Sequence, residues 1–411
     1  MQLRRLYHTV ESIASKKFDT DEDLLSHVLQ EIIRSEQFRI KGGRVWKFES
    51  RTGSYVLTYQ TGEMEKISKN YRIKVKDYPV FYELPNTRTV LSHEQDQYLR
   101  MRGIFKYSAT GVGEKIHWRG KILYKYVLAF NANEMSEDLT ATLNIISAAL
   151  SSVLRTKRIE KKAQVLERDL DKAREIQKSI LPLHEMRFHS YEVYGVSVPD
   201  LIVGGDFFDY LQAEEDQDRL GVVIGDAASK GVSAAVQALY VSGALRMGFE
   251  YQTKISVLLS RVNKLVSKAF SEEHFVSLFY SEMTNDKSGL VLYANCGHNS
   301  PILFHADTAK CDFLEPTCQL IGPFPEEKFH AENFHMNKGD ILLLYTDGVS
   351  EARNERGEFF GEEPLIQNLI EHHERSPREI AQTILERVQA FSASGEHSDD
   401  KTIVVVKRIT S

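Results

Sequence analysis

Long hydrophobic runs are missing from this 411-residue chain, and no stretch approaches the roughly 20 apolar residues that a transmembrane helix needs. The longest apolar runs, such as Ile341 to Tyr345, have the length of a strand. The first residues, Met1 to Arg5, are partly basic but no apolar segment follows them, unlike a secretory signal. We therefore expect a cytoplasmic protein without a membrane partner.

Cysteine is also scarce, and basic residues do not outnumber acidic ones. The three cysteines, Cys296, Cys311 and Cys318, are too few for a disulfide framework or a four-ligand zinc site, so ordinary reduced thiols are expected. The net charge of −6 argues against a nucleic-acid partner. A glycine-rich loop followed by Lys-Ser/Thr is absent, which leaves a nucleotide cyclase or kinase without support.

The length exceeds what one hydrophobic core usually organises, so two or three domains are expected. Residues 1–150 mix helical and strand patterns and predict a compact α+β module. The predicted helices are Asp21 to Arg34 and Ser136 to Ser152, and the predicted strands are Arg44 to Phe48, Ser54 to Tyr59, Lys115 to Trp118 and Ile122 to Ala129.

Residues 151–182 form a charged segment with a sparse apolar thread spaced alternately by four and three residues, which is typical of a two-stranded coiled coil. One interpretation is a dimer-forming linker; the alternative is a solvated helix packed on its own domain. Pro182 is expected to end the helix. The predicted seam consists of Ile159, Ala163, Leu166, Leu170, Ala173, Gln177 and Ile180.

Residues 183–411 are dominated by strand patterns with a few long helices between them, which favours sheets layered with helices. The predicted strands are Tyr191 to Val198, Leu220 to Ile224, Val276 to Glu282, Gly289 to Ala294, Pro301 to His305, Ile341 to Tyr345 and Thr402 to Lys407. The predicted helices are Gly231 to Met247, Ile255 to Phe270 and Pro377 to Phe391.

Four segments of this last region place aspartate in a turn beside an apolar strand, three of them with glycine close by. They are 203–209, 224–227, 344–348 and 398–402. Several carboxylates converging in one place would repel unless cations lay between them, and hard ions such as Mg²⁺ or Mn²⁺ prefer oxygen ligands of this kind. Each motif alone is an ordinary turn, because Asp and Gly are common turn residues.

The ordered set of motifs is more informative. The order G-G-D-F-F-D, G-D-x-x-x-K-G-x-x-A-A, N-x-G-H-N-x-P, Y-T-D-G-V-x-E-A and D-D-x-T, between about Tyr191 and Lys407, resembles the SpoIIE-type branch of the metal-dependent (PPM) serine/threonine phosphatases. The resemblance implies an α-β-β-α sandwich with two metal ions at one end.

Carried over position by position, the resemblance implies a ligand set. Asp226 would bridge the two ions and Ala227 would contribute its backbone carbonyl. Asp206 and Asp347 would be further ligands. In the last motif Asp399 matches the ligand, and Asp400 would either replace it or orient it.

Three other positions lie outside this ligand set. Asp209 could lie behind the ligands instead of binding metal. His298, in the N-C-G-H turn, is either a structural histidine or a residue near substrate. Lys230 stands where the branch frequently has histidine, and a phosphate-gripping arginine ahead of Asp206 has no clear counterpart.

The activity implied is hydrolysis of phosphoserine or phosphothreonine by a water that bridges two Mn²⁺ or Mg²⁺ ions, without a covalent intermediate. By resemblance, the substrate is a small protein, a phosphorylated anti-sigma-factor antagonist of the STAS class, in bacterial signal transduction. The alternative from another class is a catalytically weak scaffold that binds the same partner.

Residues 1–150 resemble a GAF domain in architecture, and such a module would be a small-molecule or protein sensor or a dimerisation platform. Residues 173–182 resemble the A-x-x-I-Q-x-x-L-L-P segment that precedes the catalytic domain in this branch. The hypothesis is a homodimer in which a signal at the GAF-like module re-registers the linker and shifts the helix Gly231 to Met247.

Overall fold

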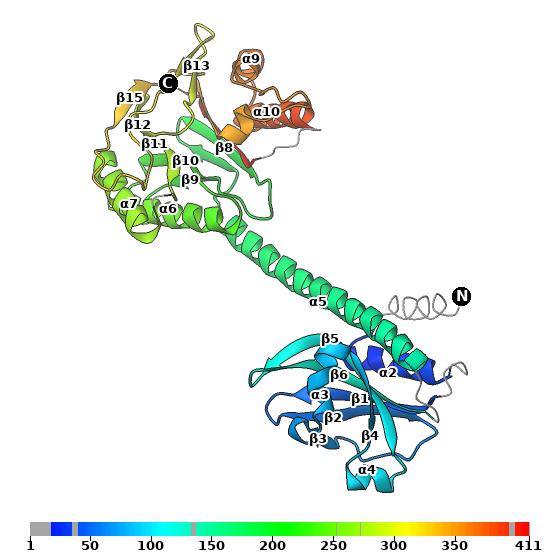
Figure 1. Cartoon of the computed structure of the whole chain (residues 1–411). Helices are drawn as coiled ribbons and strands as arrows, with labels where there is room; N and C mark the ends of the chain where they lie inside the picture. The colour runs from blue at the N-terminus through cyan, green and yellow to red at the C-terminus, as the bar shows by residue number, and fades with distance from the viewer. Residues whose placement is uncertain are drawn as a thin grey trace. The chain divides into compact units, whose positions relative to one another are not determined.

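The computed structural model describes residues 18–34, 40–132, 137–251, 253–271, 273–393 and 399–410. The chain divides into two compact units, Met1–Leu166 and Glu167–Ser411, and each is described by itself (Figure 1). Within the described ranges, no helix is both long enough and apolar enough to span a bilayer.

The N-terminal unit is built on a six-stranded antiparallel sheet with the order β3-β2-β1-β6-β5-β4. Its strands are β1 (Ile40–Glu49), β2 (Ser54–Gly62), β3 (Arg72–Lys74), β4 (Thr89–His93), β5 (Lys106–Trp118) and β6 (Lys121–Ala132). Its helices are α2 (Asp21–Arg34), α3 (Val80–Thr87), α4 (Gln97–Met101) and the first part of α5 (Glu137–Ile180), with a short 3₁₀ turn at Val75–Asp77.

Each face of this sheet has its own hydrophobic core. On one face, α2 and the start of α5 pack against side chains such as Val45 and Leu128. Helix α2 can do so because its apolar residues recur at helical spacing and form one buried stripe. On the other face, α3 and α4 cover an aromatic core that includes Trp46 and Phe81.

Helix α5 runs without interruption from Glu137 to Ile180. The predicted closing helix and the predicted linker are therefore one element, and Ser136, the predicted start of the closing helix, lies outside the described residues. The apolar residues Ile159 and Leu166 of the predicted seam are 58% and 62% exposed, whereas Gln177 is buried in the C-terminal unit. The assignment of Gln177 to a seam facing a partner helix was therefore wrong. The domain boundaries at 150 and 182 stay predictions.

The C-terminal unit contains two antiparallel sheets, with the orders β15-β12-β11-β10-β9 and β14-β13-β16-β17-β8-β7. The strands are β7 (Glu185–Phe188), β8 (Tyr191–Val198), β9 (Phe207–Leu211), β10 (Arg219–Ala227), β11 (Val276–Thr284), β12 (Leu290–Cys296), β13 (Ile302–His305), β14 (Lys310–Phe313), β15 (Glu332–His335), β16 (Ile341–Tyr345) and β17 (Lys401–Arg408). The helices are α6 (Val232–Glu250), α7 (Ile255–Ala269), α8 (Asp347–Ser350), α9 (Glu363–His372) and α10 (Pro377–Ser392).

The layers follow from alternation along the strands. Ile224 and Leu342 belong to the core between the two sheets, whereas their neighbours Val223 and Leu343 face the helices. Helices α6 and α7 cover the five-stranded sheet, and α9 and α10 cover the six-stranded one. A strand buried on both faces reads as a continuous apolar run, which explains Ile341–Tyr345. The arrangement is helix, sheet, sheet, helix, with the strand ends free to present polar groups.

Candidate metal centre

The aspartates of the four acidic turns lie at neighbouring strand ends. Asp206 directly precedes β9, and Asp226 is the penultimate residue of β10, which pairs with β9 through Gly225 and Phe207. In the other sheet, Asp347 follows β16 and Asp399 precedes β17, and these strands pair up to Tyr345 and Ile403. The register of each pair therefore brings two aspartate-bearing segments together.

Two glycines allow these segments to approach closely. A Cβ on Gly348 would overlap the backbone carbonyl of Asp400, and a Cβ on Gly204 would lie 2.6 Å from an Asp400 carboxylate oxygen. Both positions therefore exclude a side chain. The glycines of the G-G-D and T-D-G motifs have this packing role, which supports the motif-based prediction that these turns form one site.

Asp206 is held in place by a hydroxyl from the other sheet. The Thr346 Oγ1 donates a hydrogen bond to Asp206 Oδ2 at 2.6 Å, and the same oxygen accepts one from the Thr402 amide at 3.0 Å. All three residues are buried. Thr346 therefore fixes the orientation of Asp206, and sequence reasoning missed this role although Thr346 directly precedes Asp347 in the Y-T-D-G motif.

Asp400 is committed to the backbone. Its Oδ1 accepts a hydrogen bond from the Asp200 amide at 2.8 Å, and its Oδ2 accepts one from the Gly205 amide at 2.6 Å and a longer one from the Asp206 amide at 3.4 Å. The side chain is 9% exposed. Of the two roles considered for Asp400, this geometry favours orienting the turn that carries Asp206 over binding an ion.

The carboxylates raise one another's pKa values. Burial raises the pKa of Asp206 well above its usual range, and the charge of Asp226 adds to the effect. Burial also raises the pKa of Asp226 to about 7, with contributions from Asp347, Asp399 and Asp400. The pKa of Asp347 is raised by burial and by Asp399. Such mutual repulsion marks a place where a cation would be strongly favoured.

Asp399 contacts a lysine. The Lys230 Nζ lies 2.8 Å from Asp399 Oδ2, and both side chains are about half exposed. Among the residues that the structure describes, no three His, Cys, Asp or Glu side chains are grouped closely enough to hold a metal ion. The donor types nevertheless fit a hard divalent ion, because carboxylates and a backbone carbonyl are the ligands such ions take. The Ala227 carbonyl accepts a hydrogen bond from the Ser229 amide at 2.6 Å and lies beside Gly205.

Asp209 has a structural role. It is 1% exposed, and its two carboxylate oxygens accept hydrogen bonds from Arg246 at 2.5 and 2.9 Å and from Ser242 at 3.0 Å. Arg246 also donates to the Ile180 carbonyl at 2.6 Å. Asp209 therefore joins β9 to α6 and, through Arg246, to the end of α5. Of the two interpretations of Asp209, a position behind the ligands fits this geometry better than metal binding does.

Gln177 joins the end of α5 to the aspartate turn. Its side-chain Nε2 donates to the Gly204 carbonyl at 2.7 Å, and its Oε1 accepts from the Gly204 amide at 3.2 Å. One amide side chain thus satisfies both backbone groups of a residue two positions before Asp206. Sequence reasoning noted the I-Q segment but did not find this contact.

His298 lies inside the N-C-G-H turn. It is 3% exposed, its amide donates to Asn295 Oδ1 at 2.8 Å, and its Nδ1 lies 2.8 Å from Ser277 Oγ. Burial lowers the pKa of His298 to about 4, so the imidazole is neutral at pH 7. The structural interpretation of His298 is therefore favoured. Cys296, in the same turn, is fully buried, and its hydrogen bond with Cys318 and its burial raise the pKa of its thiol.

A family comparison decides the class of the domain. Residues 216–409 match the model of Stage II sporulation protein E (SpoIIE). This part of the chain is a SpoIIE-type phosphatase domain. The matched range contains Asp226, Asp347 and Asp399, whereas Asp206 lies just before it.

Two relatives of the SpoIIE-type domain are named as phosphoserine phosphatases. The chain is 26% identical over 246 residues to the phosphoserine phosphatase RsbU of Bacillus subtilis, covering 60% of this chain and 71% of RsbU. It is 26% identical over 250 residues to the phosphoserine phosphatase RsbP of the same organism, covering 58% of this chain and 57% of RsbP. The SiaA-PP2C domain of Pseudomonas aeruginosa, at 20% identity and a TM-score of 0.52, shares the fold over 60% of this chain and 98% of that domain. The predicted recognition of the phosphatase class is confirmed.

Proposed function

We propose that the C-terminal unit hydrolyses phosphoserine or phosphothreonine on a partner protein and that Asp206, Asp226, Asp347 and Asp399 hold its metal ions. The observation that carries this proposal is that burial and neighbouring carboxylates raise the pKa values of Asp206, Asp226 and Asp347, at the strand ends of a SpoIIE-type domain. The cofactor is proposed to be two Mn²⁺ or Mg²⁺ ions.

Divalent ions, when bound here, supply neutralisation of the phosphoryl oxygens and activation of water. The residues of the chain prepare the place for them. Asp226, between Asp206 in its own sheet and Asp347 and Asp399 in the other, is proposed to contact both ions. The Ala227 carbonyl is proposed as a further oxygen ligand.

Positioning residues complete the proposed site. Thr346 holds Asp206 with one of its carboxylate oxygens engaged, and Asp400 draws together the backbone of the Gly204-Gly205-Asp206 turn. A ligand carboxylate that is already oriented loses less entropy when an ion binds. Asp400 is therefore proposed to act through Asp206 instead of binding metal itself.

The proposed substrate is a phosphorylated protein of the STAS class. The named phosphoserine phosphatases among the relatives support a phosphoserine substrate. The whole chain carries a formal net charge of −6, so attraction to a phosphoprotein is proposed to arise at the site itself.

Regulation is proposed to pass through α5. Gln177 and the Ile180 carbonyl tie the end of this helix to the Asp206 turn and to Arg246 of α6. A shift of the helix end would therefore move groups next to the proposed ligands. The GAF-like assignment of residues 1–150 as the sensor module is part of the same proposal, supported by a six-stranded sheet with helices on both faces.

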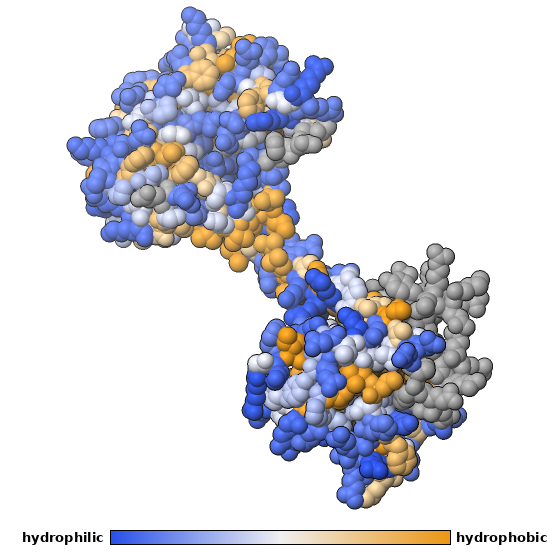
Figure 2. All heavy atoms as spheres, viewed as in Figure 1, coloured by the Kyte–Doolittle hydropathy of each residue, from blue (hydrophilic) through white to orange (hydrophobic). Residues whose placement is uncertain are grey.

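A homodimer is proposed because α5 leaves apolar side chains uncovered in the single chain. Ile159, Leu166 and Ile176 are each more than half exposed. Figure 2 shows further apolar atoms gathered over the end of α5 and the neighbouring α6, where Val232 and Val236 are about half exposed. A second copy of α5 would cover Ile159 and Leu166 of the predicted seam.

The test of the proposed activity is release of phosphate from a phosphoserine peptide and from p-nitrophenyl phosphate, with and without Mn²⁺. Turnover that requires Mn²⁺ and disappears in Asp226→Asn is the expected result. Normal folding and Mn²⁺ binding without any turnover would instead support the second candidate, a scaffold that binds the phosphoprotein. The Lys230–Asp399 ion pair is the observation that favours this second candidate, because the lysine occupies the carboxylate of a proposed metal ligand.

A further inference from the structure

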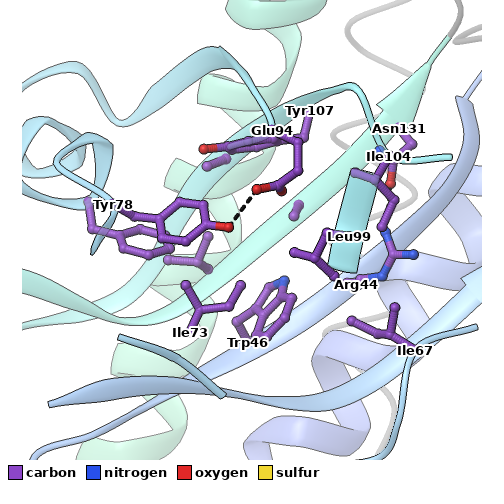
Figure 3. A pocket seen from close by; sticks show the side chains of 14 residues that line it. Arg44, Trp46, Ile67, Ile73, Tyr78, Glu94, Leu99, Ile104, Tyr107 and Asn131 are labelled. Carbon is purple, nitrogen blue, oxygen red and sulfur yellow. Dashed lines mark hydrogen bonds between the residues drawn. The ribbon is translucent and has the colours of Figure 1, made fainter. Parts of the chain in front are cut away.

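The N-terminal unit contains a cavity between its sheet and the α3–α4 side (Figure 3). Its volume is about 40 Å³. The walls are aromatic and aliphatic, with side chains such as Trp46, Leu99 and Tyr107. A mostly apolar cavity with few polar groups is the usual form of a small-molecule site.

Arg44 is the unusual member of this lining. Its side chain belongs to β1, is 3% exposed and reaches the cavity beside Trp46. Its Nη1 donates to Asn131 Oδ1 at 2.8 Å and its Nη2 to the Glu65 carbonyl at 3.1 Å, both neutral acceptors. Its Nε, which is also buried, has no hydrogen-bond partner among the described residues. Burial lowers the pKa of Arg44 to about 10, although the charge of Glu94, which lies farther away than an ion pair, acts in the opposite direction.

Glu94, the acidic residue in the lining, has other partners. Its Oε1 accepts hydrogen bonds from the Tyr78 hydroxyl and from the backbone amides of Gln95 and Asp96. No ion pair within 4.0 Å joins Glu94 to Arg44 in the described part of the chain. The guanidinium of Arg44 therefore lacks a hydrogen-bond acceptor inside the cavity, and an anionic acceptor would compensate its charge best.

We propose that this cavity binds a small apolar carboxylic acid whose carboxylate accepts hydrogen bonds from Arg44 while its apolar body lies against Trp46 and Leu99. A guanidinium presents five N–H donors in a fixed plane, and two of them are used here by Asn131 and Glu65. The Nε–H and a neighbouring Nη–H remain for the two oxygens of one carboxylate. A cavity of about 40 Å³ corresponds to about three or four water-sized sites of about 10–15 Å³ each, which favours an acid of only about four or five non-hydrogen atoms.

The proposal is tested by binding to the full-length protein, measured by isothermal titration and by the shift of thermal unfolding. The probes are acetate and propionate, with propionamide and propylamine as matched compounds that lack the negative charge. The acids are expected to bind, the amide at least tenfold more weakly, and the amine not measurably.

Arg44→Met is expected to reduce acid binding at least tenfold. Arg44→Lys keeps the charge but loses the planar donor pair, and it is expected to weaken binding by a similar factor while disturbing the fold less. Arg100→Met, at a solvent-exposed arginine of α4, is the matched control and is expected to bind as the unchanged protein does.

Failure of both acids to bind at millimolar concentration would overturn the proposal. Equal binding by the unchanged protein and Arg44→Lys, or binding of the amine as tight as that of the acid, would overturn it as well. Because the readout is binding and not phosphate release, this result is independent of the activity proposed for the C-terminal unit.

Discussion

The contact between Gln177 and Gly204 predicts a measurable link between the α5 end and the metal centre. Replacing Gln177 by leucine keeps the side chain about the same size but removes both hydrogen bonds to Gly204. The amide and carbonyl of Gly204, a buried residue, would then lose their side-chain partner. Each buried polar group left unpaired costs about 1–3 kcal/mol, so for two groups a loss of about 2–6 kcal/mol in the unfolding free energy is expected.

The assay is thermal unfolding of the full-length protein in EDTA and in Mn²⁺, following the transition that Mn²⁺ shifts. For a domain of this size the expected loss lowers the midpoint by about 4–24 °C. Because Asp206 lies two residues beyond Gly204, Mn²⁺ affinity is also expected to fall. The matched control is Gln164→Leu, the same change at an exposed position of α5. If Gln177→Leu and Gln164→Leu behaved alike in both measurements, the proposed coupling would be wrong.

Further predictions concern the site and the helix. Thr346→Val removes the hydrogen bond to Asp206 and is expected to weaken Mn²⁺ binding about 10–100-fold, measured by titration; an unchanged affinity would refute its positioning role. Lys230→Ala frees Asp399 and is expected to raise Mn²⁺ affinity by up to about fivefold, as suits an exposed ion pair; a weaker affinity would count against competition by the lysine. In EDTA, stability is expected to fall as pH rises from about 4 through 7: the pKa of Asp226 is raised to about 7, so the folded state holds a proton that the unfolded state releases. Saturating Mn²⁺ should abolish that slope, and a slope unaffected by Mn²⁺ would contradict the reasoning. Leu166→Asp is expected to convert the proposed dimer to a monomer, measured as molecular mass by light scattering. An unchanged mass would contradict the proposal that Leu166 lies in the dimer seam.

The sequence predicted the central elements of the fold well. Strands β8 and β16 and helix α2 have the predicted bounds, because their apolar residues alternate or recur with the period of the element. The edge strands β14 and β15 were missed, since most of their residues are exposed and leave no alternating pattern. Helix α8 was missed because it has only four residues, Asp347–Ser350.

The site was predicted only in part, for reasons of geometry. Acidic turns at strand ends identified the segments, but nothing in the sequence separates Asp399 from Asp400, whose side chains differ only in what they contact. Asp209 lies three residues from Asp206, yet it pairs with Arg246, which is distant along the chain. Gln177 fits a heptad position, and only the fold shows that its partner is the backbone of Gly204.

The central claim is that these aspartates form a centre for two divalent ions, and direct titration of Mn²⁺ into the metal-free protein tests it most directly. We expect about two ions to bind per chain, and we expect Asp226→Asn, which alters the carboxylate proposed to contact both, to lose most of that binding while remaining folded. Absence of Mn²⁺ binding in the unchanged protein, or full binding by Asp226→Asn, would contradict the account.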